Sequence, residues 1–214
     1  MMETPAYIEE LRVVGGNLAL DFLNTVNGDP PVECLRGYGD LVAWSVWVGL
    51  LSADEGERLV GEADLRPEDA EAAHSDALRL RGALSGVFRA IVEDEDPPLQ
   101  NLEDIRDYEC EALWHGRLAR GDDGFDWEWT EEGDLARVWW PVAHAATELL
   151  TSGDLDRLKL CAGCYWLFLD ASKNRSRRWC TMEVCGTDEK IRRYVAKRAA
   201  KRNAKRDQEG SNLS

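Results

Sequence analysis

Four of the six cysteines in this chain fall within 25 residues near its C-terminal end. Cys161 and Cys164 form a C-x2-C pair, and after a 15-residue spacer Cys180 and Cys185 form a C-x4-C pair. This spacing is typical of tetrahedral zinc, whose four thiolate ligands lie at about 2.3 Å from the metal. Because all four predicted ligands are cysteines, no position is left for water. We therefore expect a structural zinc ion and no hydrolytic zinc chemistry.

A small module around these cysteines needs a metal ion or disulfides to fold, because domains below about 40 residues seldom bury enough apolar surface alone. Zinc ligation contributes about 10–16 kcal/mol of apparent binding free energy to folding. The alternative is a redox C-x2-C pair, but that motif opens a helix after a buried strand and needs no second pair nearby. The two remaining cysteines, Cys34 and Cys110, lie far away in the sequence and are expected to be buried hydrophobic residues.

Charge divides the chain into two parts. Residues 1–153 hold 11 arginines, no lysine and 33 acidic residues, for a net charge of −22, whereas residues 154–214 carry +7. The overall net charge of −15 would by itself argue against nucleic acid or an anionic membrane as a partner. The asymmetry instead points to an anionic partner for the basic part. We predict an acidic regulatory domain over 1–153 and a zinc module with a basic helix over 154–214.

The basic part carries 13 Lys and Arg residues but only three acidic residues between positions 172 and 206. Guanidinium and ammonium donors at this density suit phosphate oxygens. The predicted nucleic-acid contacts are Lys173, Arg175, Arg177 and Arg178 between the cysteine pairs, and Lys190, Arg193, Lys197 and Lys201 on a helix predicted over residues 187–206. Two alternatives remain open: a solvated charged face, and a contact with the acidic part that inhibits binding until a ligand releases it.

Three aromatic residues, Trp166, Phe168 and Trp179, accompany the cysteines. In a small zinc module they are expected to form a miniature core. If they were exposed, they could instead stack on unpaired bases, so RNA is an alternative to DNA as the partner. A third alternative, from another class, is a protein-interaction adaptor whose zinc module binds an acidic protein.

The acidic part is dominated by helical periodicity, and the predicted fold class is mainly α. It comprises a multihelical N-terminal domain with a short β-hairpin, followed by the four-cysteine zinc module and its basic helix. Helices are predicted over residues 17–26, 40–51, 67–93, 99–119 and 141–152, and Asp40 is the predicted cap of the second. A capping box at Ser52 and Glu55 predicts the start of one more helix. The hairpin is predicted to pair residues 125–129 with residues 135–140.

A polar stripe interrupts the first predicted helix. Asn17, Asp21 and Asn24 lie at i, i+4 and i+7, so they share one face. They could bind a small effector in a sensory pocket, or they could simply satisfy loop amides. The three histidines are isolated, and neither a nucleophile motif nor a phosphate-binding glycine loop occurs, so we expect no enzyme activity.

Nothing in the sequence predicts a membrane partner. The longest apolar candidate, residues 41–51, is shorter than the roughly 18 residues of a spanning helix. The first ten residues lack the basic and apolar regions of a signal peptide. We expect a cytoplasmic protein whose cysteines stay reduced.

The residues from Cys161 to Gly186 follow the pattern C-x2-C-x-W-x-F-x-D-x-S-x-N-x-S-R-R-W-C-x-M-x2-C-G, which resembles the CGNR zinc finger. The resemblance implies a zinc ion on the four cysteines and a role in binding DNA. One departure is plain. Thr187 and Asp188 stand where the family has Asn and Arg, so any phosphate contact of that arginine does not carry over.

Residues 15–25, GGNLALDFLNT, are similar to the opening of the ABATE domain, which precedes this finger in bacterial proteins described as stress-induced transcription regulators. Together the two resemblances imply a zinc-dependent, DNA-binding transcriptional regulator. The polar stripe adds the hypothesis that its N-terminal domain senses a small ligand. A homodimer would fit this role, because regulators of palindromic sites are commonly two-fold dimers.

Overall fold

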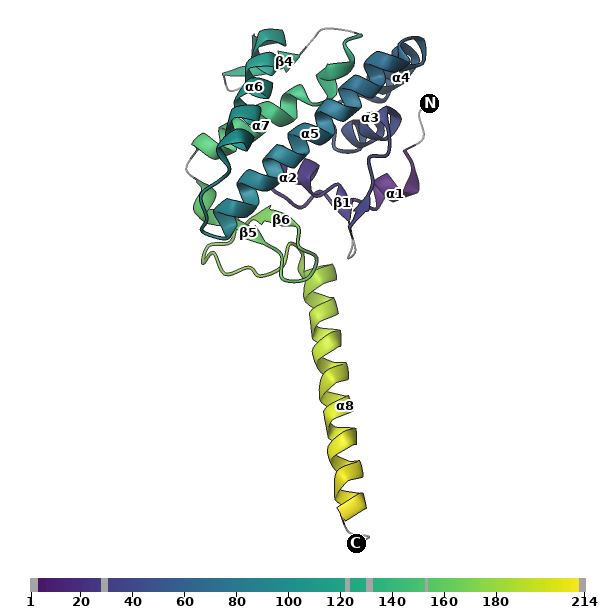
Figure 1. Ribbon diagram of the computed structural model, residues 1–214, viewed down its shortest axis with the longest axis vertical. Helices are drawn as coiled ribbons and strands as arrows, with labels where there is room; N and C mark the ends of the chain where they lie inside the picture. Colours follow the sequence, from purple (N-terminus) through teal and green to yellow (C-terminus); the bar gives the residue numbers. More distant parts are fainter. Residues whose placement is uncertain (1–3, 28–30, 122–123, 130–132, 153, 212–214) are drawn as a thin grey trace.

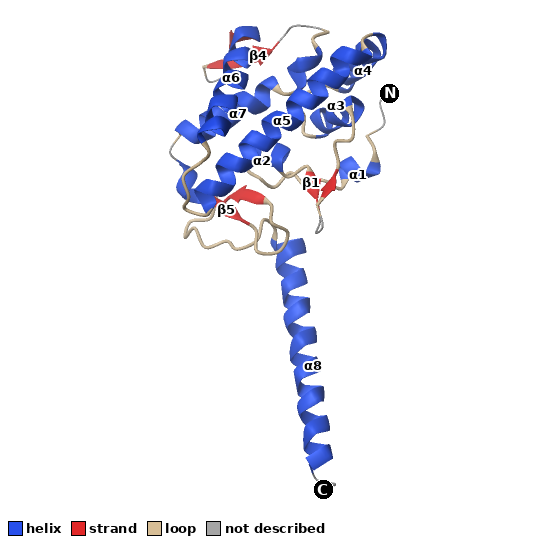
Figure 2. Cartoon of the chain, viewed as in Figure 1, coloured by secondary structure: helices blue, strands red, loops and turns tan. Residues whose placement is uncertain are grey.

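The computed structural model describes residues 4–27, 31–121, 124–129, 133–152 and 154–211; for Asn27, Asp154 and residues 201–211 it describes the backbone only. It confirms the predicted fold class: helices form most of the molecule, the strands form two-stranded hairpins, and the cysteine module ends in a helix (Figures 1 and 2). None of the described helices is long and apolar enough to cross a membrane.

The helical body is built around one long central helix, α5 (Pro67–Val92), which crosses the molecule (Figure 1). Pro67 starts it at a first-turn position, where the missing N–H costs nothing. Its Leu80, Leu84, Val87 and Phe88 are fully buried. The helices that surround it are α1 (Ala6–Glu9), α2 (Leu18–Leu23), α3 (Tyr38–Trp47), α4 (Ala53–Leu65), α6 (Leu99–His115) and α7 (Trp140–Thr151).

Two helix starts show how well capping can be predicted. The capping box is confirmed at α4, where the Glu55 N–H donates to Ser52 Oγ at 3.3 Å and the Ser52 N–H donates to Glu55 Oε2 at 2.9 Å. The predicted cap at Asp40 is wrong, because α3 begins at Tyr38. Asp40 instead accepts hydrogen bonds from the Arg36 N–H and the Tyr7 hydroxyl, and so fixes the chain that enters the helix.

The predicted hairpin exists, but its partner strand was predicted wrongly. Strand β4 (Phe125–Trp129) pairs antiparallel with β3 (Gly116–Arg120), a segment predicted as the end of a helix. Residues Leu135–Val138 form a 3-10 turn instead of a strand. Buried side chains explain the difference. Trp139 and Trp140 are consecutive and both at most 1% exposed, which an alternating half-exposed strand does not allow.

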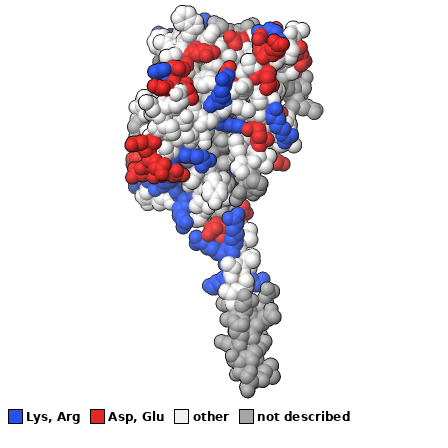
Figure 3. Space-filling model, viewed as in Figure 1, with Lys and Arg blue, Asp and Glu red and all other residues white. Residues whose placement is uncertain are grey.

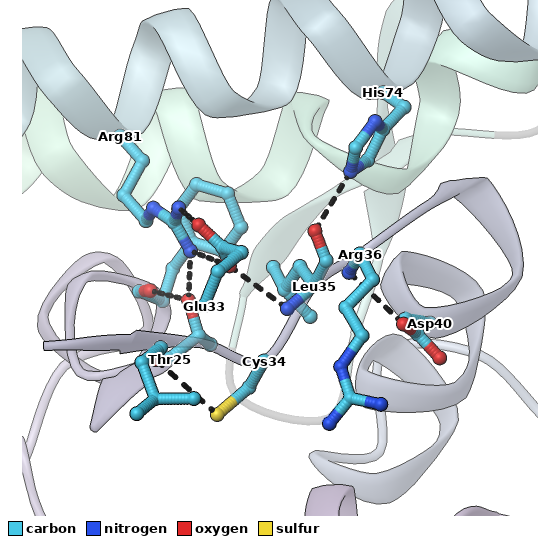
Figure 4. Close-up of polar contacts among 10 residues, drawn as sticks. Thr25, Glu33, Cys34, Leu35, Arg36, Asp40, His74 and Arg81 are labelled. Carbon is cyan, nitrogen blue, oxygen red and sulfur yellow. Dashed lines mark hydrogen bonds and ion pairs between the residues drawn. The ribbon is translucent and has the colours of Figure 1, made fainter. Parts of the chain in front are cut away.

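A polar network lies beneath α5 (Figure 4). Arg81 reaches from the helix to a short hairpin of β1 (Val26–Asn27) and β2 (Val32–Glu33), where it forms two hydrogen bonds with Glu33 and donates to Thr25 Oγ1 at 2.7 Å. Burial alone would raise the pKa of Glu33, but the hydrogen bonds from Arg81 and the Leu35 N–H outweigh it and lower that pKa. The network therefore holds an ion pair whose arginine is buried and whose carboxylate is partly exposed.

The cysteine module is packed onto the helical body and shares its core. Strands β5 (Leu158–Leu160) and β6 (Leu167–Leu169) form an antiparallel hairpin against α2 and α5. Trp166 and Phe168 are at most 4% exposed and belong to the same buried cluster as the helices. They are thus part of a common core and not a miniature core of the module alone. Only α8 (Thr187–Ser211) projects away from the body (Figure 1).

Candidate metal centre and basic surface

The four predicted ligands come together. The sulfur atoms of Cys161, Cys164, Cys180 and Cys185 all lie within 4.8 Å of one another. Cys180 Sγ is 3.6 Å from Cys164 Sγ and 3.7 Å from Cys185 Sγ. A regular tetrahedron with metal–sulfur bonds of about 2.3 Å has sulfur–sulfur edges of about 3.8 Å. Both the spacing and the all-thiol donor set therefore fit a zinc ion in a closed structural site.

Backbone amides support the first ligand. The N–H groups of Gly163 and Cys180 point to Cys161 Sγ at 3.4 Å and 3.3 Å. A glycine is needed at 163 for a steric reason, because a Cβ there would lie 2.9 Å from the Cβ of Cys185. Tyr165 completes the turn in the left-handed region, with φ of 61°, and its N–H donates to the Cys161 carbonyl at 3.2 Å.

A cation from the far end of the chain lies beside the sulfurs. Arg12 Nη1 is 3.8 Å from Cys185 Sγ, 4.0 Å from Cys180 Sγ and 3.3 Å from Thr181 Oγ1, and its guanidinium packs 4.6 Å from the ring centroid of Trp166. Four thiolates on one divalent ion leave a net negative charge, which this cation partly neutralises. Sequence analysis missed Arg12, since no spacing rule links residues about 170 positions apart.

The clustered cysteine thiols do not all lose their protons readily, because each thiolate disfavours the ionisation of its neighbours. The hydrogen bonds that the Cys180 thiol donates to Cys161 and Cys164, together with burial, raise the pKa of Cys180 far above its ordinary value. Zinc binding must displace these protons. The other two cysteines lie outside the cluster. Cys34 is buried, as predicted, whereas the prediction for Cys110 is wrong, because it lies on an outer face of α6 and is exposed.

A buried carboxylate organises the loop that carries the predicted phosphate contacts. Asp170 is fully buried and accepts hydrogen bonds from Lys159 Nζ at 2.7 Å, from the Ser172 N–H at 2.9 Å and from the Arg177 N–H at 2.8 Å. Burial would raise the pKa of Asp170, but these bonds outweigh it and keep the pKa well below the ordinary value. The loop between the cysteine pairs is therefore folded around a fixed anion.

The four loop cations have different environments. Lys173 and Arg178 are exposed, and Arg178 packs 5.4 Å from the ring centroid of Trp179. Arg175 is exposed but paired with Asp156. Arg177 is half-buried, packs over Phe168 and donates to the Cys180 carbonyl, so much of its guanidinium is engaged inside the module.

The cations predicted on the last helix lie in the open. Lys190, Arg193 and Lys197 are exposed, and Arg193 Nε pairs with Glu189 Oε1 at 2.7 Å. Figure 3 shows blue side chains around the junction between the module and α8, while most red side chains lie on the helical body. The side chain of Lys201 lies outside the described residues. The acidic body does not cover the described cations of α8, as the autoinhibition alternative would require (Figure 1).

The predicted polar stripe is used for internal contacts. Asn17 caps α2 by accepting from the Ala19 N–H at 2.9 Å. Asp21 Oδ1 accepts from the N–H groups of Val14 and Gly15 at 2.8 and 2.7 Å, and burial raises its pKa despite these bonds. An effector site formed by the whole stripe remains a prediction, and these contacts give it no support.

The third residue of the stripe, Asn24, joins the module to the body. Its Nδ2 donates to the Leu167 carbonyl at 2.8 Å, and its Oδ1 accepts from the Leu167 N–H at 3.0 Å. Nearby, the Leu169 N–H donates to the Gly15 carbonyl at 2.8 Å. Strand β6 therefore bonds through its backbone to the segment that surrounds α2.

Replacing Asn24 by alanine is expected to lower the free energy of unfolding by about 2–4 kcal/mol. The change leaves both backbone groups of Leu167 buried without a partner, and each such group costs about 1–3 kcal/mol. Urea denaturation measures the loss, and hydrogen exchange of the Leu167 amide localises it. The matched control, Asn17→Ala, removes a helix cap and a longer hydrogen bond of 3.3 Å to the Ala145 carbonyl, and should cost about 1–2 kcal/mol. Equal losses in both variants would contradict this role of Asn24.

Comparison with known families agrees with this geometry. The model of the ABATE domain, described as a putative stress-induced transcription regulator, matches residues 16–153. The model of the CGNR zinc finger matches residues 157–198 and so includes all four cysteines. Neither description is that of an enzyme. No curated protein matches the chain.

Proposed function

The chain belongs to the ABATE family and carries a CGNR zinc finger, and on this basis we propose that it is a zinc-dependent transcriptional regulator that binds DNA through the finger and α8. The observation that carries the proposal is the projecting helix. Ile191, Tyr194 and Val195 on α8 are 55–61% exposed, and the cations between them face solvent. A helix without a buried face gains little stability from packing, so we expect it to be completed by a partner of opposite charge.

Duplex DNA fits this surface better than single-stranded RNA. Recognition of unpaired bases relies on exposed aromatic rings. In this finger Trp166 and Phe168 are buried, and Tyr165 is the largely exposed aromatic side chain among the described finger residues before α8. A helix with exposed cations, in contrast, can lie along a phosphate backbone or enter a major groove. We propose Lys173, Arg178, Lys190 and Lys197 as the principal phosphate contacts, with Arg175, Arg193 and Lys201 beside them and Arg177 positioning the loop.

Binding of duplex DNA by the full-length, zinc-loaded protein is expected to depend steeply on salt. If about six phosphates are neutralised, log K falls against log salt with a slope of about −5, which is a loss of about 1,000-fold between 50 and 200 mM salt. Fluorescence anisotropy with a labelled duplex measures the slope, and structured RNA as a competitor compares the two partners. A salt-independent affinity, or tighter binding of RNA, would overturn the proposal. If the protein binds neither DNA nor RNA detectably, the alternative of a protein-interaction adaptor would be favoured.

The remaining parts of the proposal follow from this role. Residues 1–153 form the regulatory domain and respond to a small effector, and residues 154–214 form the finger with its basic helix. The protein acts in the cytoplasm, where its thiols stay reduced. A second copy of the chain would let two α8 helices contact the halves of a palindromic site. Selection of bound sequences from random DNA identifies that site and its symmetry.

A further inference from the structure

A cleft of about 660 Å³ lies where the finger meets the helical body. One side is formed by α2, β1 and α5, and the other by the residues that follow the metal ligand Cys164. Ligand sites commonly occur at such junctions and have volumes of about 300–1,000 Å³. Of the predicted polar stripe, only Asn24 reaches this cleft.

The chemistry of the walls indicates what the cleft accepts. Leu23, Val26 and Leu78 contribute apolar surface from the body, and Trp166 and Leu167 contribute it from the finger. Among the residues that the structure describes, the charged ones along the cleft are Arg81 and Arg89, and none of the described lining residues is a carboxylate. This is unusual in a body whose residues 1–153 include 33 acidic residues and only 11 arginines. The cleft therefore combines apolar walls with positive charge.

The two arginines differ in what they can offer a ligand. Arg81 is nearly buried, and its charge is balanced by Glu33 (Figure 4). Arg89 is exposed and has no carboxylate partner among the described residues. Its Nε donates to Ser85 Oγ at 3.2 Å and its Nη2 to the Tyr165 carbonyl at 3.3 Å. A guanidinium has five N–H donors, so donors remain at Arg89 for an anion.

We propose that this cleft binds a small organic acid, with its carboxylate at Arg89 and its apolar body between Leu78 and Trp166. The bound acid would contact Tyr165 and Trp166, which directly follow the ligand Cys164. Its occupancy therefore stabilises the docked position of the zinc-binding turn. The regulatory meaning of the site rests on the proposed function, whereas the binding itself does not depend on DNA.

A glycine in the cleft allows a sharp test. Gly82 lies inside α5 and lines the cleft, and a Cβ built there meets no atom within 4 Å. Gly82→Leu is therefore expected to fill the cleft without backbone strain, and it should favour the helix by up to about 1 kcal/mol. Gly61→Leu is the matched control, because Gly61 also lies inside a helix, α4, with open space at its Cβ, but away from this cleft.

The probe is 1-anilinonaphthalene-8-sulfonate, a fluorescent aromatic anion, added to the full-length, zinc-loaded protein without DNA. We expect one probe to bind per chain. Octanoate should displace it at a concentration at least about tenfold lower than the concentration of octan-1-ol that does so, because only the acid pairs with Arg89. Gly82→Leu should abolish binding, and Gly61→Leu should retain it. Arg89→Gln should remove the preference for octanoate. If the probe does not bind, or binds equally to both leucine variants, the proposed site is overturned. If Arg89→Gln keeps the preference for octanoate over octan-1-ol, the assignment of the carboxylate to Arg89 is overturned.

Coupling to the finger has its own measurement. Because a ligand of the folded state opposes its opening, saturating octanoate is expected to slow zinc transfer to a chelator by about threefold or more in the unaltered protein. Gly82→Leu should show no such effect. Equal rates with and without octanoate in the unaltered protein would overturn the coupling, while the DNA experiment independently tests the proposed function.

Discussion

Cys180→Ser is expected to abolish stoichiometric zinc binding. Cys180 is 1% exposed, and its Sγ lies within 3.7 Å of the sulfurs of both Cys164 and Cys185. A serine hydroxyl is a poor zinc ligand, and a closed four-cysteine site then keeps only three of its four thiolates. The loss removes much of the roughly 10–16 kcal/mol that zinc contributes to such modules.

The structural consequence should be confined to part of the finger. Strand β6 keeps its bonds to Asn24 and Gly15, whereas residues 170–186 lose the metal that closes their loop. We therefore expect fast hydrogen exchange over 170–186 and retained protection in α5. Zinc content per chain measures the primary effect. The control, Cys110→Ser, changes an exposed cysteine outside the cluster and should retain one zinc. Full zinc content in Cys180→Ser would refute the predicted ligand set.

Reversing three charges on α8 is expected to weaken DNA binding by about 100-fold or more at roughly 100 mM salt. The variant carries Lys190→Glu, Arg193→Glu and Lys197→Glu, all at exposed positions with no contact to the helical body among the described interactions. Each lost phosphate contact reduces the salt slope by about 1, so the slope should fall from about −5 to between about −2 and −3. Anisotropy titrations at several salt concentrations measure both quantities.

The matched control makes the same change in net charge on the helical body. It carries Arg79→Glu, Arg106→Glu and Arg117→Glu, whose side chains are 64–68% exposed. These arginines form surface ion pairs, which contribute little to stability. If binding depended only on net charge, both variants would lose affinity equally. We expect the control to bind nearly as well as the unaltered protein, and an equal loss would refute a DNA contact at α8.

The predictions that succeeded depend on local sequence. The capping box at Ser52, the start of α5 at Pro67 and the C-x2-C turn each involve residues within a few positions of one another, so their geometry follows from backbone rules. The hairpin failed for the opposite reason. Strands β3 and β4 are short and mostly exposed, and which segment pairs with β4 depends on the burial of Trp139 and Trp140 by distant helices.

The candidate site shows the same division. Sequence spacing predicted all four clustered cysteines, but not Arg12, which lies beside their sulfurs. It predicted the cations of the loop, but could not distinguish the exposed Arg178 from Arg177, which packs over Phe168. Asn24 looked like a candidate for ligand binding, whereas the fold uses its amide to hold Leu167.

The sequence by itself determined the zinc ligands, the helical character and the separation of charge, because these depend on residue type and on spacing along the chain. Only the tertiary structure decided that the finger shares a core with the body, that a cleft with Arg89 lies between them and that α8 extends into solvent. The physical reason is that burial and the pairing of polar groups depend on contacts between segments more than 100 residues apart, such as Asn24 with Leu167.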